Sequence, residues 1–340
     1  MAEKGTYRDF IPENVAPKGT KRIGIYDENG RRVGQIPLGN LTPPNAGDKL
    51  YSFGVVSDVH LGDTDDKNEQ EDFSRALTYM NNDQSVAFIC VCGDLTNGGS
   101  VAQLTEFKDY ITPFSTSTPV YAITGNHDAW NGNIENLIAT YTGHSLYYSF
   151  THGNDVFIMV GIKNDDDVFT AEEIQWLADT LEANRNKRCF VFQHAMRMDG
   201  CGNPYSGVKP TYEMLTEGNG PTFTSLVSNY PNVIWFHGHS HTTFDSQADN
   251  PMANYDKKFG IHSVHIPSVS KPRKYNGSTY DTEYEESEGY VVDVYENGIH
   301  LRGRDFKNGE YLPIASYWLD TILKNVEAGT YSDSTGTIKT

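Results

Sequence analysis

Five short clusters of metal-ligating residue types each follow a run of β-branched or aromatic residues in this chain. The runs span residues 53–57, 86–92, 120–124, 189–193 and 233–236. The clusters that follow them are Asp58-Val-His60, Gly93-Asp94, Gly125-Asn126-His127-Asp128, His194 and Gly238-His239-Ser240-His241. Short apolar runs are typical of buried strands, and ligand sites form beyond the carboxyl ends of such strands. We therefore expect the five clusters to converge on one edge of a sheet.

Carboxylate, amide and imidazole groups from these clusters make up a mixed oxygen and nitrogen ligand set. Residues two apart at a strand end point to the same side, so Asp58 and His60 can reach one ion, and His239 and His241 repeat that spacing. Asp94 follows a glycine that permits close backbone approach, and we expect it to bridge two cations with its two oxygens. The predicted metal ligands are Asp58, His60, Asp94, Asn126, His194, His239 and His241. A set of this kind is typical of Mn, Fe, Zn or Ni sites.

Each residue also has a plain structural interpretation. Asp and Asn at strand ends often make turns or cap helices, and a histidine in a loop is often simply solvated. The joint pattern favours a site, because five of the chain's eleven histidines fall in clusters that each follow a strand-like run.

The motifs D-x-H, G-D, G-N-H-D, H and G-H-x-H resemble those of the calcineurin-like metallophosphoesterase superfamily. That superfamily includes purple acid phosphatases, protein Ser/Thr phosphatases and class III cyclic-nucleotide phosphodiesterases. The resemblance implies one metal held by Asp58, His60, Asp94 and His241, and a second held by Asp94, Asn126, His194 and His239. It also implies that His127 binds no metal and faces the substrate, where it protonates the leaving alkoxide or stabilises charge on the phosphoryl group.

The function expected from this resemblance is metal-dependent hydrolysis of a small phosphomonoester or phosphodiester. Two divalent ions would acidify a bridging water, and the resulting hydroxide would attack phosphorus in line with the leaving group. A nuclease of the same superfamily and a non-catalytic binding protein on the same scaffold are the alternatives. A formal net charge of -18 repels polyanions and argues against the nuclease. The complete ligand set argues against the binding protein.

Departures from the family pattern add further candidate residues. Many relatives carry Asp three positions after the bridging Asp, where this chain has Asn97, and an amide does not stabilise an imidazolium as a carboxylate does. Asp128 is therefore a second candidate catalytic residue, with helix capping as the alternative. Arg197 is a candidate phosphate contact, with a solvated charge as the alternative. His237 shares a strand face with His239 and is a candidate support for the site.

The order of expected elements predicts an α/β (α+β) fold, a four-layer αββα sandwich of two mixed β-sheets flanked by helices. Strands alternate with helices at about 69–82, 100–114 and 134–141, and a capping box at Thr170 and Glu173 opens another helix. Strands are then expected at 261–266, 288–295 and 299–305.

We expect three regions along the chain. Residues 1–50 form a leader with a β-hairpin around Asn29-Gly30 and a linker. Residues 51–315 form the metallophosphoesterase domain, whose strands from about 260 complete the second sheet. Residues 316–340 form a C-terminal segment with a frayed tail. A loop at 198–210 is expected beside the active site.

The cysteine content and the lack of long apolar segments indicate where in the cell such an enzyme works. The four cysteines, Cys90, Cys92, Cys189 and Cys201, lack Cys-x-x-Cys spacing, so we expect free thiols with structural roles. Residues 1–20 hold no apolar stretch typical of a signal peptide, and no later window approaches 18 uninterrupted apolar residues. We therefore expect a cytoplasmic protein that acts on a small phosphoester, without a membrane or nucleic acid as its partner.

Overall fold

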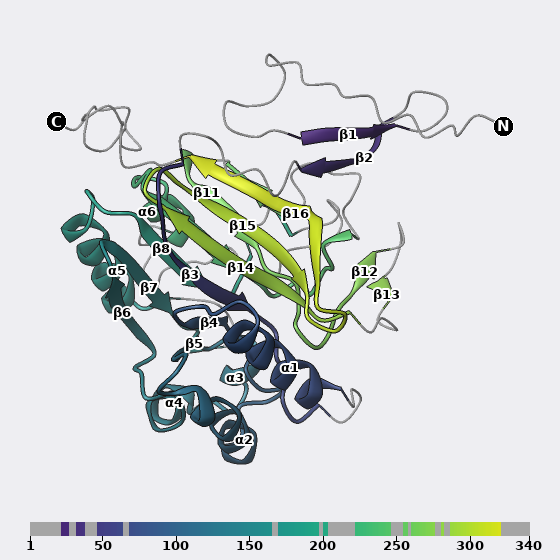
Figure 1. Ribbon diagram of the computed structural model, residues 1–340. Helices are drawn as coiled ribbons and strands as arrows, with labels where there is room; N and C mark the ends of the chain where they lie inside the picture. Colours follow the sequence, from purple (N-terminus) through teal and green to yellow (C-terminus); the bar gives the residue numbers. More distant parts are fainter. Residues whose placement is uncertain are drawn as a thin grey trace.

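The computed structural model contains two six-stranded β-sheets packed face to face, with helices against their outer faces (Figure 1). It describes residues 22–26, 32–37, 46–63, 68–164, 169–196, 200–202, 222–245, 254–257, 260–275, 280–281 and 286–320. This arrangement is the predicted sandwich of two mixed sheets between helices.

The first sheet joins three parallel strands to three antiparallel ones, in the order β16-β15-β14-β3-β4-β5. The parallel strands are β3 (Lys49–Val56), β4 (Ile89–Cys92) and β5 (Val120–Ile123). The antiparallel strands are β14 (Glu288–Tyr295), β15 (Gly298–Asp305) and β16 (Glu310–Asp320). Strands β14, β15 and β16 therefore complete the first sheet alongside β3, and the expectation that the C-terminal strands complete the second sheet was wrong for these three.

The second sheet has four parallel strands between two antiparallel edges, in the order β10-β11-β9-β8-β7-β6. Its parallel strands are β7 (Asp155–Val160), β8 (Cys189–Gln193), β9 (Val233–His237) and β11 (His262–His265). Its edges are β6 (Tyr147–His152) and β10 (Tyr255–Asp256).

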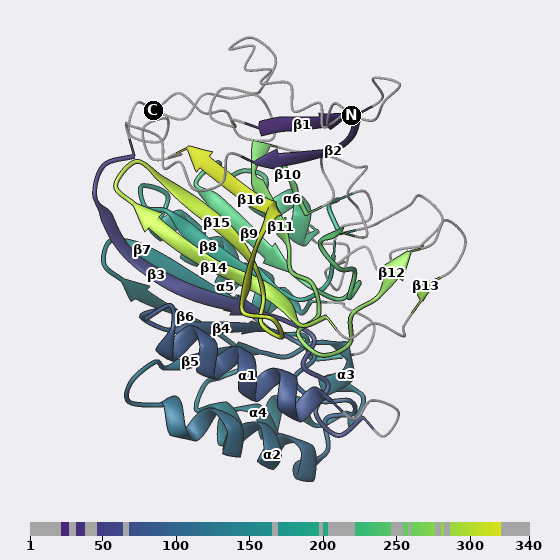
Figure 2. The same cartoon turned by 45° about the vertical axis from the view of Figure 1, so that its right-hand side comes forward.

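Helices pack against the outer faces of the parallel strands (Figures 1 and 2). Those beside β3, β4 and β5 are α1 (Glu69–Asn82), α2 (Val101–Ile111), the short 3-10 helix η1 (Thr112–Phe114), α3 (Asn126–Ala129) and α4 (Ile134–Thr142). Those beside the second sheet are α5 (Ala171–Ala183) and α6 (Phe223–Val227). The predicted capping box is present, because Thr170 Oγ1 accepts from the Glu173 backbone and Glu173 from the Thr170 backbone.

Aromatic side chains fill the space between the two sheets. The rings of Phe53, Phe157 and Phe190 lie with centroids 4.7 to 5.2 Å apart and are fully buried. Alternate residues, such as Val91 and Val191, belong to the cluster formed with the helices. The parallel strands are thus covered on both faces, which explains their continuous apolar runs. This packing fixes the strand ends from which the predicted ligands project.

Several features at the ends of the chain were predicted only in part. Strands β1 (Arg22–Tyr26) and β2 (Arg32–Pro37) pair antiparallel as expected, while the turn between them lies outside the described residues. Strand β16 continues past position 315, and the sequence did not indicate it because Pro313 interrupts the run. Proline is tolerated there because β16 is an edge strand.

The short strands β12 (Lys274–Tyr275) and β13 (Tyr280–Asp281) were also not predicted.

The four cysteines are buried free thiols, as expected. Most of the loop expected at 198–210 lies outside the described residues. Among the helices that the structure describes, none combines the length and hydropathy needed to span a bilayer.

Candidate metal centre

The predicted ligands come from both sheets, and the expectation of a single sheet edge was wrong. Asp58, Asp94 and Asn126 follow the neighbouring strands β3, β4 and β5 of the first sheet. The histidines come from the second sheet, where His194 follows β8 and the 238–241 loop follows the adjacent β9. The backbone N–H of His239 donates to both carboxylate oxygens of Asp58 at 3.2 Å, which ties the two sheets together at the site.

An unusual backbone conformation, rather than strand alternation, aims most of these side chains. Six non-glycine residues among those described have positive φ, and five of them are predicted ligands: Asp58, His60, Asp94, His239 and His241, with φ from 48° to 73°. This left-handed region is disfavoured for residues with a Cβ atom, and such strain concentrates at functional sites. Alternation of side chains along a strand was the expected reason for the pairs Asp58 with His60 and His239 with His241. That explanation was wrong, because all four residues have positive φ.

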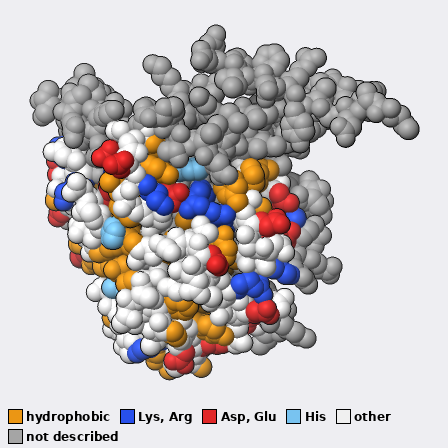
Figure 3. Space-filling view, viewed as in Figure 1, with side chains coloured by type: hydrophobic (Ala, Val, Ile, Leu, Met, Phe, Trp, Pro, Cys, Tyr) orange, Lys and Arg blue, Asp and Glu red, His pale blue; other side chains and the backbone are white. Residues whose placement is uncertain are grey.

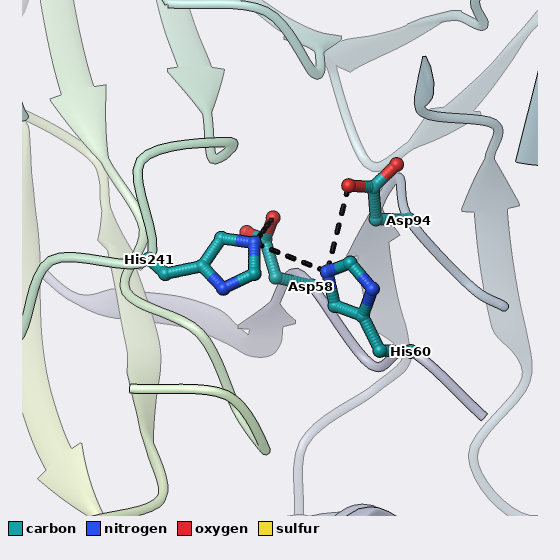
Figure 4. Close-up of side chains that lie close together, drawn as sticks. All are labelled: Asp58, His60, Asp94 and His241. Carbon is teal, nitrogen blue, oxygen red and sulfur yellow. Dashed lines mark hydrogen bonds and ion pairs between the residues drawn. The ribbon is translucent and has the colours of Figure 1, made fainter. Parts of the chain in front are cut away.

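The first cluster of candidate ligands comprises Asp58, His60, Asp94 and His241, all buried (Figure 4). His241 Nε2 lies 3.1 Å from Asp58 Oδ1 and 3.0 Å from His60 Nε2. His60 Nε2 lies 3.5 Å from Asp94 Oδ2. Two imidazole nitrogens and two carboxylates thus face one small volume, which is the donor set that a divalent transition metal binds.

The second cluster comprises Asp94, His194 and His239, with Asn126 beside it. His194 Nε2 lies 3.2 Å from Asp94 Oδ2, and His239 Nδ1 lies 3.0 Å from Asn126 Oδ1. The grouping of His241 with the first cluster and His239 with the second matches the division that the family resemblance implies. The two histidines therefore do not share one group of ligands, contrary to the expectation from their spacing alone.

Asp94 links the two clusters through one oxygen. Its Oδ2 faces both His60 and His194, whereas its Oδ1 accepts a hydrogen bond from the backbone N–H of His127 at 2.9 Å. The sequence-based expectation that each oxygen serves one cation is not what this geometry shows. Asp94 Oδ2 and His194 Nε2 are buried and have no hydrogen-bond partner among the described residues. Buried polar atoms left in this way fit a bound cation.

Backbone carbonyls orient two of the histidines. Nδ1 of His194 donates to the carbonyl of Cys92 at 2.7 Å, and Nδ1 of His241 donates to the carbonyl of Lys271 at 2.9 Å. Each bond turns Nε2 into the cluster, and a ring that carries its single proton on Nδ1 would offer the Nε2 lone pair to a cation. Histidines that bind metals are commonly held in this way.

The charges of the two clusters also suit cations. Burial opposes ionisation of Asp58 and Asp94, but the neighbouring histidines outweigh it and hold the pKa of both carboxyls below the usual value. Burial likewise opposes a charge on His194, yet Asp94 and Asp58 raise its pKa to about 10. Burial and His194 lower the pKa of His239 to about 4. The clusters therefore pair two carboxylates and a protonated His194 with a neutral His239, and a bound metal would take the place of the His194 proton.

Two glycines of the motifs make room for the ligands. A Cβ atom on Gly125 would lie 2.2 Å from Asp94 Oδ1, and one on Gly93 would lie 2.5 Å from His194 Nδ1. Such distances are far inside van der Waals contact. Any side chain at these positions would displace the residue that links the clusters or one of its partners.

His127 lies beside the first cluster and is not part of it. Its ring meets that of His60 edge-on, with centroids 4.5 Å apart. Its Nδ1 lies 3.2 Å from the backbone carbonyl of Asn97, so the main chain at position 97, and not the amide side chain, holds the ring. The sequence-based concern about Asn in place of Asp therefore does not apply to ring orientation. With Nδ1 at this carbonyl, the other ring nitrogen, Nε2, is the candidate for contact with a substrate.

Asp128 has a structural role in this site. Its carboxylate is fully buried and accepts hydrogen bonds from the backbone of Leu95, Thr96 and Gly125 and from the Thr96 hydroxyl, at 2.7 to 3.0 Å. These bonds join the loop after β4 to the loop after β5. The capping alternative raised by the sequence describes this carboxylate better than the catalytic one.

The remaining candidates lie elsewhere. His237 ends β9, is fully buried and contacts Cys201 with 3.5 Å between its Nε2 and Sγ, so it is outside both clusters. Arg197 lies outside the described residues, and no contact can be assigned to it.

Sequence reasoning missed the segment after β11 that supports the first cluster. Ser268 Oγ donates to the carbonyl of Asp58, Ser270 Oγ donates to the carbonyl of Val59, and Lys271 supplies the carbonyl that holds His241. Strand β11 is parallel to β9, so its carboxyl end reaches the same side of the molecule. The polar run Ser-Val-Ser-Lys after that strand was the available signal.

The sequence model of the calcineurin-like phosphoesterase family matches residues 51–243, more than half of the chain. The chain belongs to the calcineurin-like phosphoesterase family. The match spans all five motifs, and the phosphoesterase fold accounts for the meeting of both sheets at the ligand clusters.

Solved structures that are similar to this chain have low sequence identity to it. GAP50 of Plasmodium, described as the anchor in the inner membrane complex, is 12% identical over 85% of this chain and 99% of its own, with a TM-score of 0.50. A predicted phosphoesterase from Streptococcus pneumoniae is 12% identical over 79% of this chain and 97% of its own, with a TM-score of 0.40. SoxB, a sulfate thiohydrolase from Thermus thermophilus, is 12% identical over 85% of this chain and 60% of its own, with a TM-score of 0.43.

Proposed function

We propose that this protein hydrolyses a small phosphomonoester or phosphodiester with the help of two divalent cations. Family membership and the clustered ligands support phosphoester hydrolysis in general. The observation that carries the two-cation proposal is the position of Asp94 Oδ2, which lies 3.5 Å from His60 Nε2 and 3.2 Å from His194 Nε2 and so belongs to both clusters.

The proposed ligands divide between the two clusters. Asp58, His60, Asp94 and His241 would hold one cation, and Asp94, Asn126, His194 and His239 the other. When bound, two such cations neutralise phosphoryl charge and make an attacking water more acidic. Manganese, iron, zinc and nickel all fit the mixed nitrogen and oxygen donors.

His127 is the residue proposed to act on the leaving group. Its Nδ1 is held by the Asn97 carbonyl, so Nε2 carries or receives the proton that passes to the departing oxygen. The backbone N–H of His127 is bonded to Asp94 Oδ1, which fixes the ring's residue relative to the candidate ligands. Asp128 is proposed to position both loops and not to take part in proton transfer.

The net charge of the chain favours small substrates. A formal charge of -18 opposes the approach of a nucleic acid backbone, whereas a single phosphoester at a site with two cations is attracted locally. We therefore propose a small ester as the substrate, and rank a nuclease and a non-catalytic binding protein below it.

Metal reconstitution of the purified protein tests this function. The protein is stripped with a chelator, reloaded with Mn²⁺ or Zn²⁺, and assayed with 4-nitrophenyl phosphate and bis(4-nitrophenyl) phosphate. We expect hydrolysis only after metal is restored, with about two ions bound per chain. The ratio of the two rates separates a monoesterase from a diesterase.

A matched pair of variants makes the test specific. Asp94→Asn keeps the size of the side chain but removes the charge that both clusters share, so metal content and activity should fall together. Asp293→Asn removes the charge of another buried carboxylate, on β14, that bonds Ser52 and Arg302, so metal content and activity should stay. A wild-type protein that binds two metal ions and hydrolyses neither ester, nor any ester of a broader phosphate-release panel, points to the binding-protein alternative.

A further inference from the structure

An exposed tryptophan lies beside the proposed catalytic histidine. Three large hydrophobic side chains are exposed among the described residues, namely Leu50, Val101 and Trp130. Trp130 is 53% exposed and follows directly after α3, three positions beyond His127. Its ring lies on the His127 ring with centroids 3.9 Å apart and planes inclined by 33°. Half of a large aromatic side chain is thus kept in water next to the reaction centre.

The backbone holds Trp130 firmly in this place. Its N–H donates to the carbonyl of His127 at 3.3 Å, and the next residue, Asn131, donates from its side chain to the carbonyl of Gly99 at 3.0 Å. The loop that contains Gly99 also supplies the Asn97 carbonyl that holds His127. The tryptophan and the histidine are therefore anchored to the same loop, so the tilted contact between their rings is a built feature of the site.

The contacts of His127 indicate where a leaving group must go. The imidazole meets His60 of the first cluster edge-on, and it also contacts the Trp130 ring at a tilt of 33°. The phosphoryl group belongs at the clusters, and His127 acts on the oxygen that departs from it. The substituent on that oxygen therefore extends away from the clusters, toward the rim where the indole of Trp130 is exposed.

We propose that Trp130 is a specificity-determining residue whose indole face receives a planar aromatic leaving group of the ester. The proposal rests on the proposed phosphoesterase function and names the substrate class of that same site. Stacking of a flat ring on an aromatic side chain covers apolar surface on both partners and contributes about tenfold to hundredfold in affinity.

Binding of substrate-like phosphonates tests the proposal without turnover. Phenylphosphonate and propylphosphonate are titrated by calorimetry into the Mn²⁺-loaded wild-type protein and into Trp130→Ala, Trp130→Phe and Leu50→Ala. Leu50 is also 53% exposed but lies near the start of β3, at the end opposite the ligands, so it controls for the loss of an exposed apolar side chain. We expect Trp130→Ala to weaken phenylphosphonate about tenfold or more and propylphosphonate less than about twofold. Trp130→Phe should keep most of the preference for phenylphosphonate over propylphosphonate, and Leu50→Ala should keep all of that preference.

Kinetics with phenyl phosphate, propyl phosphate and phosphocholine complete the test. For each ester the rate of the variant is divided by that of the wild type, so that the different intrinsic reactivities of the three esters cancel. Trp130→Ala should raise KM selectively for the phenyl ester. An equal loss on all three esters would show that Trp130 only orients His127, and a larger loss on phosphocholine would show a cation site; either result overturns the proposal. A wild-type protein with no preference for phenylphosphonate overturns it as well.

The outcomes separate this proposal from the function on which it rests. If the protein prefers phenylphosphonate through Trp130 but hydrolyses no ester, the phosphoesterase function fails and the aromatic subsite stands. If hydrolysis is rapid and Trp130→Ala leaves the phenyl-to-propyl ratio unchanged, the function stands and the aromatic subsite fails.

Discussion

Oδ1 of Asp94 accepts a hydrogen bond from the backbone N–H of His127 at 2.9 Å. The carboxylate that links the two ligand clusters therefore also fixes the residue proposed to act on the leaving group. Positioning of metal and of proton donor thus depends on one side chain, while the imidazole of His127 lies outside the ligand set.

We expect His127→Ala to separate metal binding from catalysis. The variant keeps its backbone N–H, so Asp94 stays in place and about two metal ions should remain bound. The rate should fall by about 10² to 10⁴, the usual contribution of a positioned proton donor. Metal content by mass spectrometry and kcat with 4-nitrophenyl phosphate measure the two effects. His144→Ala, a change at a half-buried histidine outside the ligand clusters, serves as the control. A fully metal-loaded His127→Ala protein with the wild-type rate would show that the assigned role is wrong.

Gly125→Ala should disrupt the metal site with a single added methyl group. The new Cβ would lie 2.2 Å from Asp94 Oδ1 and 2.4 Å from the Asp94 backbone nitrogen, so the carboxylate must move away from both clusters. We expect metal affinity to fall at least about tenfold, because ligands displaced by steric conflict lose their geometry. Gly132→Ala, at a position with open space around it but a φ of +70°, controls for the loss of a glycine and for the backbone strain that the loss brings. Equal metal affinity in both variants would contradict this account.

Asp128→Ala tests whether that carboxylate positions loops or transfers protons. Removing it leaves the N–H groups of Leu95, Thr96 and Gly125 without their acceptor, at a cost in folding free energy of about 1 to 3 kcal/mol for each buried donor left unsatisfied. Denaturant unfolding should show a large loss of stability. In protein that stays folded and metal-loaded, the pH dependence of kcat should keep its shape. A shifted pH profile at unchanged stability would instead support the catalytic role.

Acid should destabilise the protein partly through His262. Burial, followed by the charge of Lys257, lowers the pKa of this histidine from 6.5 to about 3, and its Nδ1 bonds the Tyr255 hydroxyl at 2.8 Å. Between those values the unfolded chain binds a proton that the folded chain does not. Folding stability from this group is therefore complete above pH 6.5 and declines as the pH falls toward 3. The slope approaches about 1.4 kcal/mol per pH unit.

Unfolding by urea at several pH values, with chelator present so that metal loss does not contribute, measures that slope. His262→Gln should show a shallower loss of stability between pH 6 and about 4 than the wild type, whatever its stability at neutral pH. Identical slopes would mean that His262 is not neutral and buried in the folded protein.

The alternation of strand-like and helix-like segments was enough to predict the sandwich, whereas the division of the candidate ligands between two cations was implied by the family resemblance and stays a prediction. Side chains such as Asp58, Asp94 and His194 carry their chemistry in their identity, and the runs before them indicate strands. The strand-end argument failed in its detail, because His239 and His241 sit in left-handed turns and not on a strand. The sequence does not predict a left-handed turn unless glycine occupies the position.

The sequence could not predict which backbone carbonyls hold the histidine rings of the site. The carbonyls of Cys92, Asn97 and Lys271 hold three histidines, and every residue has a carbonyl, so nothing in the side chains marks these positions. The substitution of Asn97 for the usual Asp drew attention to a side chain when the main chain holds the ring. Strand β16 escaped prediction because proline reads as an interruption, although an edge strand accepts it.

The origin of the ligands in two separate sheets has a mechanical consequence. A cation held by Asp58 and His241, or by Asp94 and His194, fastens one layer of the sandwich to the other at their shared rim. The metal would thus connect the two sheets as well as take part in the reaction. Its loss would weaken the contact between the sheets that brings the reacting groups together.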